Sequence, residues 1–136
     1  MQINVSTQQG HVPVAVMQLN GDLDASNYTE AIQKAQELYA GGARNLILDL
    51  SNVPYMSSAG LMAIHTLVLV FGVGQTTNKE GGRPAFRAVN PQRDTAAREH
   101  VKLLNPQAKV GQVLEMVGLK QFFQIFDNLQ NAIDSF

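Results

Sequence analysis

Two adjacent serines, Ser57 and Ser58, are the residues of this sequence whose types and position most readily suggest chemistry. They precede Ala59-Gly60-Leu61, the start of a long apolar stretch, and so stand where a helix is expected to begin. A serine at that position serves most often as an N-cap, whose oxygen accepts a hydrogen bond from a backbone N–H of the first turn. It can also accept a phosphoryl group, because a helix N-terminus tolerates negative charge. Taken alone, the two serines leave both roles open, and the cap is the commoner one.

Aspartates elsewhere in the chain do not form a catalytic or metal-binding pattern. Asp22 and Asp24 fit a turn followed by a helix cap, and Asp49 fits the end of a strand. No glycine-rich phosphate loop, nucleophile elbow or metal-ligand spacing accompanies them. The histidines are widely separated and have no cysteine or acidic companion at ligand spacing: His11, His65 and His100. We therefore expect a protein that is not an enzyme and that holds no metal and no cofactor.

Charge and composition limit the class of partner. The 136 residues carry 10 Lys and Arg against 11 Asp and Glu, so no global field favours direct binding to nucleic acid or to an anionic membrane. The chain has no cysteine and begins without a basic segment followed by an apolar one, so we expect a cytoplasmic protein. The longest apolar run, Leu61 to Val73, is interrupted by polar residues and is shorter than the roughly 20 residues that span a bilayer. It predicts a buried helix.

The first half of the sequence predicts a hairpin, a helix, a buried strand and a second helix. β-Branched residues and turn chemistry indicate the hairpin, and a helical apolar stripe that ends at two glycines indicates the helix. A short unbroken apolar run is typical of a strand buried on both faces. The ranges are Gln2 to Thr7 paired with Val12 to Leu19, a helix from Tyr28 to Gly41-Gly42, a strand at Asn45 to Leu50, and a helix from Ser57 or Ser58 to about Phe71.

The second half predicts two more strands and two more helices after an unusually long connection at about residues 72–99. His100 to Leu104 is interpreted as the fourth strand. A third helix follows from Pro106, with Gly118 in its C-terminal capping position. A last strand at Phe122 to Phe126 and a short helix through Leu129, Ile133 and Phe136 finish the chain.

The fourth strand has one rival, Pro84 to Val89, because Asn90-Pro91-Gln92 after it is a near copy of Asn105-Pro106-Gln107. We favour the later strand, since only the later pair stands at the expected distance before the apolar residues of the next helix. Strands that alternate with helices after a hairpin predict an α/β fold, with a mixed sheet of about five strands and about four helices packed against it. The length predicts a single domain over residues 1–136.

Three sequence blocks carry a family resemblance. They are Leu19-Asn20-Gly21-Asp22-Leu23-Asp24, then Asp49-Leu50-Ser51-Asn52-Val53 through Ser57-Ser58-Ala59-Gly60-Leu61, and finally Asn105-Pro106 with Val110, Val113-Leu114 and Gly118-Leu119. In this order they resemble the anti-sigma factor antagonists of the STAS domain family. The likeness covers nearly the whole chain apart from about residues 72–99, and it implies the STAS fold and a non-enzymatic binding protein.

The resemblance also implies a phosphorylation switch. Such proteins bind an anti-sigma factor that is also a serine kinase, and phosphorylation of the serine at the start of the second helix releases them; a serine phosphatase is the other expected partner. The matching residue is Ser58. The family often has an aspartate just before this serine, whereas Ser57 stands there, so Ser57 is the second choice for the phosphate. The implied partner-binding residues are Asp22, Leu23, Asp24, Ser57, Ser58, Ala59, Gly60 and Met62.

A second hypothesis is a scaffold or small-ligand sensor, because the same domain type also serves in transport and stress complexes without a phosphate. A scaffold should form oligomers, whereas the switch predicts a monomer that gains a phosphate. The second helix is apolar almost all round, so its outer side should be covered by a partner protein or by the chain's own connection at about residues 72–99. The sequence does not show whether a partner protein or the chain's own connection packs on the outer side of this helix.

Overall fold

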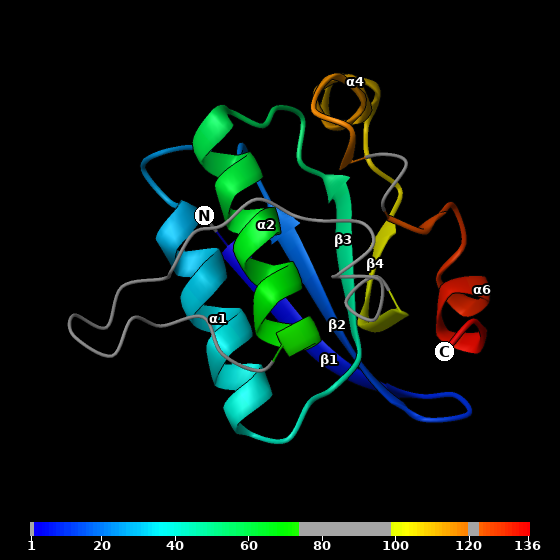
Figure 1. Cartoon of the computed structure of the whole chain (residues 1–136). Helices are drawn as coiled ribbons and strands as arrows, with labels where there is room; N and C mark the ends of the chain where they lie inside the picture. Colours follow the sequence, from blue (N-terminus) through cyan, green and yellow to red (C-terminus); the bar gives the residue numbers. More distant parts are fainter. Residues whose placement is uncertain (1, 74–98, 120–122) are drawn as a thin grey trace.

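A five-stranded sheet forms the centre of the computed structural model, which describes residues 2–73, 99–119 and 123–136 (Figure 1). The strands lie in the order β1-β2-β3-β4-β5, with β1 and β2 antiparallel and all later neighbours parallel. Their bounds are Gln2–Gln9, Pro13–Asn20, Leu46–Asn52, Val101–Leu104 and Ile125–Phe126. This arrangement confirms the mixed α/β sheet that the sequence predicts.

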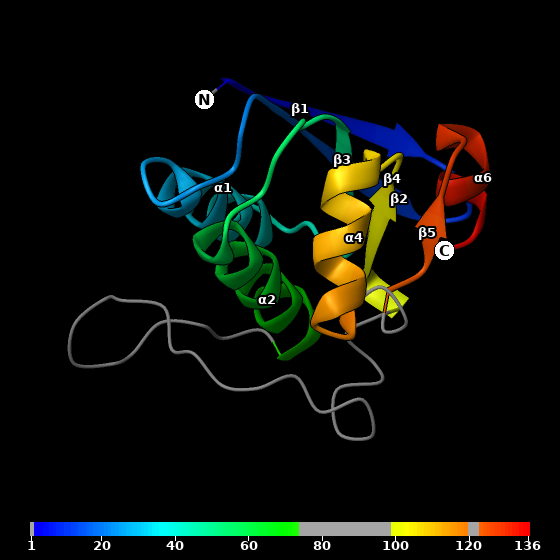
Figure 2. The same ribbon diagram turned by 90° about the horizontal axis from the view of Figure 1, so that it is seen from above.

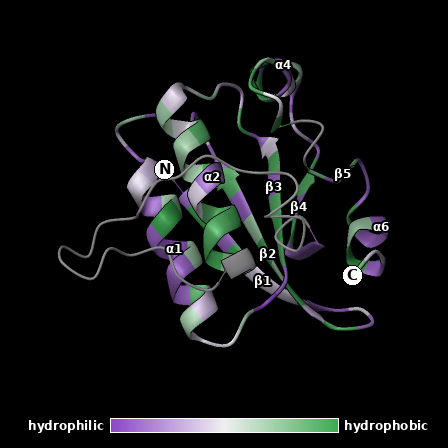
Figure 3. Ribbon diagram, in the orientation of Figure 1, coloured by the Kyte–Doolittle hydropathy of each residue, from purple (hydrophilic) through white to green (hydrophobic). Residues whose placement is uncertain are grey.

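Helices cover both faces of the sheet (Figure 2). α1, α2 and α4 pack on one face, and the C-terminal α6 packs on the other. Their bounds are Tyr28–Ala40 for α1, Ser58–Val73 for α2, Ala108–Met116 for α4 and Leu129–Asp134 for α6. α1 displays hydrophilic residues on its outer side, whereas α2 is more uniformly apolar (Figure 3).

Alternating residues of β2 supply two separate hydrophobic cores. Ala15 and Met17 belong to the large core beneath α1, α2 and α4, whereas Val14 and Val16 belong to a smaller core beneath α6. Successive side chains of a strand point to opposite faces, so an apolar run is needed where both faces are covered. The unbroken apolar sequence of this strand therefore follows from the two layers of helices.

The C-terminal half differs from the expected element bounds in small ways. His100 precedes β4 rather than starting it, and β5 is short within the described residues. β4 nevertheless lies between β3 and β5, so the choice of the later strand is confirmed. The rival strand at 84–89 and most of the connection at 72–99 lie outside the described residues. The expectation that this connection packs on the outer side of α2 therefore concerns residues that the structure does not describe. No helix within the described ranges has both the length and the apolar character to cross a membrane.

Candidate functional site

The loop after β2 and the loop after β3 are joined directly in front of α2. The backbone N–H of Leu23 donates to the carbonyl of Tyr55 at 3.0 Å, and the N–H of Ser57 donates to the carbonyl of Leu23 at 3.0 Å. These two bonds make an isolated parallel bridge between Leu23 and Met56. Because both loops follow the carboxyl ends of neighbouring parallel strands, the fold brings two of the three resembling sequence blocks into contact.

Gly60 fixes how closely the first turn of α2 approaches this bridge. A Cβ atom on Gly60 would lie 2.6 Å from the carbonyl oxygen of Leu23 and 2.6 Å from Cγ of Met56. A backbone oxygen cannot move aside as the end of a flexible side chain can, so only glycine fits without a shift of the loop. The start of α2 therefore sits against the loop that carries Asp22 and Asp24.

The two serines occupy different positions at the start of α2. Ser57 is the N-cap: it is half-buried, and its Oγ accepts a hydrogen bond from the backbone N–H of Gly60 at 3.4 Å. Ser58 is the first residue of the helix, its side chain is exposed, and its hydroxyl has no hydrogen-bond partner within the described residues. The structure thus gives the cap role to one serine and leaves the other hydroxyl open to solvent.

Asp24 organises the turn that leads into α1. Its carboxylate accepts hydrogen bonds from the hydroxyl and the backbone N–H of Ser26, at 2.5 and 2.9 Å, and its own N–H donates to Oδ1 of Asn27 at 2.9 Å. The side-chain bond from Ser26, followed by the backbone bond, lowers the pKa of Asp24. Asp22 is exposed, and its carbonyl accepts a bond from Asn27 at 2.7 Å. Two acidic residues therefore flank Leu23, the residue that contacts the start of α2.

Apolar side chains border the exposed serine. Met62, one turn after Ser58 in α2, is 40% exposed, and Tyr55, in the loop before it, is 49% exposed. Ala59 lies between them and is half-buried. Met62 and Ala59 were among the partner-binding residues that the resemblance implies, whereas Tyr55 was not, although an aromatic residue beside Pro54 in a loop after a buried strand could have indicated it. Solvent-exposed aromatic and methionine side chains are common at protein contact surfaces.

Asp49 and His100 make structural hydrogen bonds away from the start of α2. Oδ1 of Asp49 accepts hydrogen bonds from the N–H and the hydroxyl of Ser51, at 3.0 and 2.7 Å, as expected at a strand end. Nδ1 of His100 lies 2.9 Å from Oδ1 of Asn45. Among the residues that the structure describes, no three side chains of the metal-ligating types come together.

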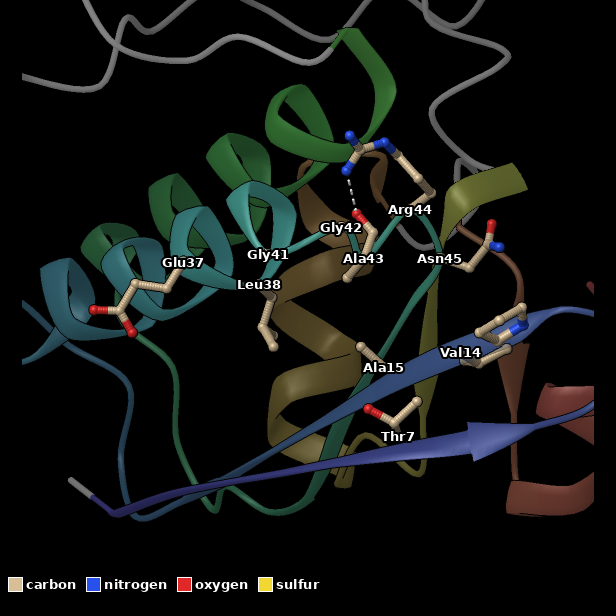
Figure 4. Close-up of a pocket in the computed structure, with 11 residues that line it drawn as sticks. Thr7, Val14, Ala15, Glu37, Leu38, Gly41, Gly42, Ala43, Arg44 and Asn45 are labelled. Atoms are coloured by element: carbon tan, nitrogen blue, oxygen red, sulfur yellow. Dashed lines mark hydrogen bonds between the residues drawn. The ribbon is translucent and has the colours of Figure 1, made fainter.

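A hollow of about 450 Å³ lies at the opposite end of the parallel strands, between the end of α1 and the β1–β2 hairpin (Figure 4). Leu38 and Thr7 face into it, while the charged groups of Glu37 and Arg44 extend away from it. Nη1 of Arg44 donates instead to the carbonyl of Ala43 at 2.8 Å. The hollow could hold a small ligand, as the ligand-sensor hypothesis requires, but neither Glu37 nor Arg44 points a charged group into it.

The fold and the site together define a class of protein: a small α/β domain that presents an exposed serine at the first residue of a helix, beside an acidic turn and an apolar border. The model of the STAS domain family matches residues 2–92. The chain belongs to the STAS domain family, as the resemblance in its sequence predicts.

Several proteins that resemble this chain in sequence or in structure are described as anti-sigma factor antagonists. An anti-sigma F factor antagonist from Paenibacillus polymyxa is 28% identical over 130 residues, which cover 90% of this chain and 86% of that protein. A candidate anti-sigma factor antagonist from Thermotoga maritima has a similar structure, with a TM-score of 0.71 at 18% identity over 97% of this chain and 92% of that one. The anti-sigma factor antagonist SpoIIAA in its unphosphorylated form gives a TM-score of 0.62 at 20% identity, over 98% and 94% of the two chains. The phosphorylated form of SpoIIAA from Bacillus gives 0.61 at 17% identity, over 98% and 97%.

Proposed function

We propose that this chain is an anti-sigma factor antagonist whose binding to its partner is controlled by phosphorylation of Ser58. The observation that carries the proposal is the contrast between the two serines: Ser57 is occupied as the cap of α2, and the hydroxyl of Ser58 is exposed. Membership of the STAS family and the likeness to antagonists with phosphorylated and unphosphorylated forms support it. The reaction is transfer of the γ-phosphoryl group of ATP to Oγ of Ser58 by the partner kinase, with ADP as the other product.

The proposed partner surface consists of exposed and half-buried side chains at the start of α2 and in the two loops that precede α1 and α2. Asp22 and Asp24 supply negative charge, and Tyr55 and Met62 supply apolar area. Unphosphorylated Ser58 lies among them as a small neutral group, which a partner can cover at little cost. The partner that we propose is an anti-sigma factor with serine kinase activity, and a serine phosphatase would return the protein to its binding form.

Phosphorylation would change this surface strongly. A phosphate adds a charge of about −1.5 to −2 and a bulky hydrated group. The N-terminus of α2 stabilises that charge locally, so the fold tolerates the modification. A partner packed on Tyr55 and Met62 would have to desolvate the phosphate beside two aspartates, and this cost opposes binding. The expected outcome is release of the partner without unfolding of the domain.

The test has two steps. The protein is first isolated from its own source cells, and intact-mass analysis followed by fragmentation locates any phosphate; we expect it on Ser58. The binding of Ser58→Asp and Ser58→Ala to the anti-sigma factor of the same cells is then measured by titration calorimetry. Ser58→Asp should bind at least about tenfold more weakly than wild type, whereas Ser58→Ala should bind normally and resist release by ATP.

Asn131→Asp is a matched control, because it adds one exposed negative charge on α6, on the other face of the sheet. It should leave partner binding unchanged. Equal binding by Ser58→Asp and Ser58→Ala would remove the role that we assign to Ser58. A phosphate found on Ser57 would move the switch to the cap position.

A further inference from the structure

The two edges of the sheet differ greatly in length. β5 forms one edge and has two residues, whereas β1 forms the other and has eight, Gln2–Gln9. β1 pairs with β2 along its whole length without a bulge. No strand among the described residues pairs with its outer side, which lies at the margin of the molecule (Figures 1 and 2). A long regular edge of this kind exposes backbone groups that can pair with another strand.

The register identifies the backbone groups on this free edge. The N–H of Ala15 in β2 donates to the carbonyl of Asn45 at 2.9 Å, so the backbone groups of Ala15 face β3 and not β1. Thr7 is the partner of Ala15 across the hairpin, and that pair is therefore a non-hydrogen-bonded one. Along a strand, the N–H and C=O groups of successive residues point to opposite sides. The outward-facing backbone groups accordingly belong to Ile3, Val5, Thr7 and Gln9.

The side chains of β1 lack the usual protection of an edge. The strand reads Gln-Ile-Asn-Val-Ser-Thr-Gln-Gln and contains no charged residue and no proline, the features that commonly prevent edge-to-edge pairing. Val5, at its centre, is 36% exposed. A hollow of about 310 Å³ between Ile3 and the polar side of α1 also shows that this helix leaves room beside the edge. The edge is therefore accessible and carries no charge that would repel a copy of itself.

We propose that the outer edge of β1 binds β1 of a second copy of this chain, antiparallel, with the two-fold axis at Val5. This register pairs the three β-branched residues of the outward-facing set with one another: Val5 meets its equivalent, and Ile3 meets Thr7 of the other copy. Each of the three pairs exchanges two backbone hydrogen bonds. β-Branched side chains lie opposite each other in all of them, which favours cross-strand packing. The result is a symmetric dimer with one continuous sheet, in place of the monomer favoured from the sequence.

The dimer does not involve the proposed switch, so a dimeric chain would not by itself favour the scaffold hypothesis over the switch, contrary to the expectation from the sequence. Ser58 lies at the carboxyl ends of β2 and β3, whereas the dimer edge runs along β1. Loss of phosphorylation at Ser58 would leave the dimer intact. Conversely, a monomeric variant would still present the Ser58 hydroxyl, so failure of one proposal is distinguishable from failure of the other.

The test measures the molar mass of the full chain by sedimentation velocity from about 1 to about 200 µM. Wild type should shift from monomer to dimer in this range. Val5→Lys brings two like charges together at the axis and should weaken the dimer at least about tenfold, whereas Gln2→Lys adds the same charge to the same strand far from its equivalent and should not. Circular dichroism would show that both variants are folded.

Disulfide trapping tests the register directly, because the chain contains no cysteine. Residues in a hydrogen-bonded antiparallel pair have Cα atoms about 5.5 Å apart, within the range of a disulfide. Val5→Cys should therefore form a covalent dimer on mild oxidation, and Gln2→Cys should not. A wild-type chain that stays monomeric at the highest concentration, or a dimer that Val5→Lys and Gln2→Lys affect equally, would overturn the proposal.

Discussion

Around the start of α2, a buried layer and an exposed layer lie next to each other and make different contacts. The buried layer consists of Leu23, Met56 and Gly60, which contact one another and the hydrophobic core. The exposed layer consists of side chains that face solvent: Asp22, Tyr55, Ser58 and Met62. The sequence resemblance placed members of both layers in one set of partner-binding residues. The structure shows that only some of them are accessible to a partner.

This difference separates two ways in which a substitution can impair function. A change in the buried layer should act through stability or through the position of α2, because no partner atom can reach Leu23 or Gly60 in the folded domain. A change in the exposed layer should alter affinity and leave stability nearly constant, as surface substitutions commonly do. Paired measurements of unfolding and binding can therefore assign each residue to a layer.

The largest effect is expected for Gly60→Ala. The new methyl group would meet the Leu23 carbonyl oxygen at 2.6 Å, and we expect the free energy of unfolding to fall by about 1–3 kcal/mol, as for other overpacked sites. Gly111, within α4, is the matched control, because nothing lies within 4 Å of a Cβ built there. Gly111→Ala should raise the free energy of unfolding by about 0.5–1 kcal/mol, since alanine favours the helix.

Urea denaturation of both variants provides the measurement. Opposite signs for the two glycine substitutions would support the close contact between the start of α2 and the Leu23 loop. If Gly60→Ala were as stable as wild type and bound the partner more weakly, Gly60 would belong to the exposed layer instead.

A smaller effect is expected at the two serines, where one substitution should lower stability and the other should abolish phosphorylation. Ser57→Ala removes the cap oxygen that accepts from Gly60, so the free energy of unfolding should fall by about 0.5–1 kcal/mol while Ser58 stays available for phosphorylation. Ser58→Ala removes a hydroxyl without a partner in the described structure and should leave stability within about 0.5 kcal/mol of wild type, but abolish phosphorylation. Thermal unfolding and intact-mass analysis of the two variants measure both properties. If Ser58→Ala destabilised the protein and Ser57→Ala did not, Ser58 would be the cap and Ser57 the candidate for phosphorylation.

Much of the fold could be predicted from the sequence because local patterns determine it. The stripe of α1 and the unbroken apolar run of β3 each indicate an element and its buried faces, and both agree with the structure. The burial of Leu23 and Gly60 could not be predicted, since it depends on a bridge between two loops that are distant in the chain. Tyr55 was missed for the same reason: only the bridge shows that its loop borders α2.

Lys102 illustrates a second limit of sequence patterns. A lysine in a strand is normally placed at a solvated position, yet Lys102 is only 3% exposed. Its Nζ donates to the carbonyl and the hydroxyl of Ser135, at 3.0 and 2.8 Å, and lies 4.2 Å from the ring centroid of Phe136. Burial lowers the pKa of this lysine. The C-terminal residues that satisfy its ammonium group come from the other end of the chain, so no local pattern indicates the burial.

The smallest effect is expected for the charge of Asp24, a half-buried residue two positions after Asp22 of the exposed layer. The Ser26 hydroxyl and N–H stabilise the ionised carboxylate, so the folded-state pKa lies below the ordinary value of about 3.9. A depressed pKa contributes stability that is fully present above the unfolded-state pKa and is lost as pH falls through the folded-state pKa.

Ser26→Ala removes the larger of the two contributions, the side-chain hydrogen bond, and should raise the pKa of Asp24 toward its ordinary value. NMR titration of the Asp24 carboxyl group in both proteins measures this directly. The stability difference between wild type and Ser26→Ala should also be larger at pH 7 than at a pH below the folded-state pKa of Asp24. An unchanged Asp24 pKa would mean that the backbone N–H alone stabilises the carboxylate, and that the negative charge of Asp24 does not depend on the Ser26 side chain.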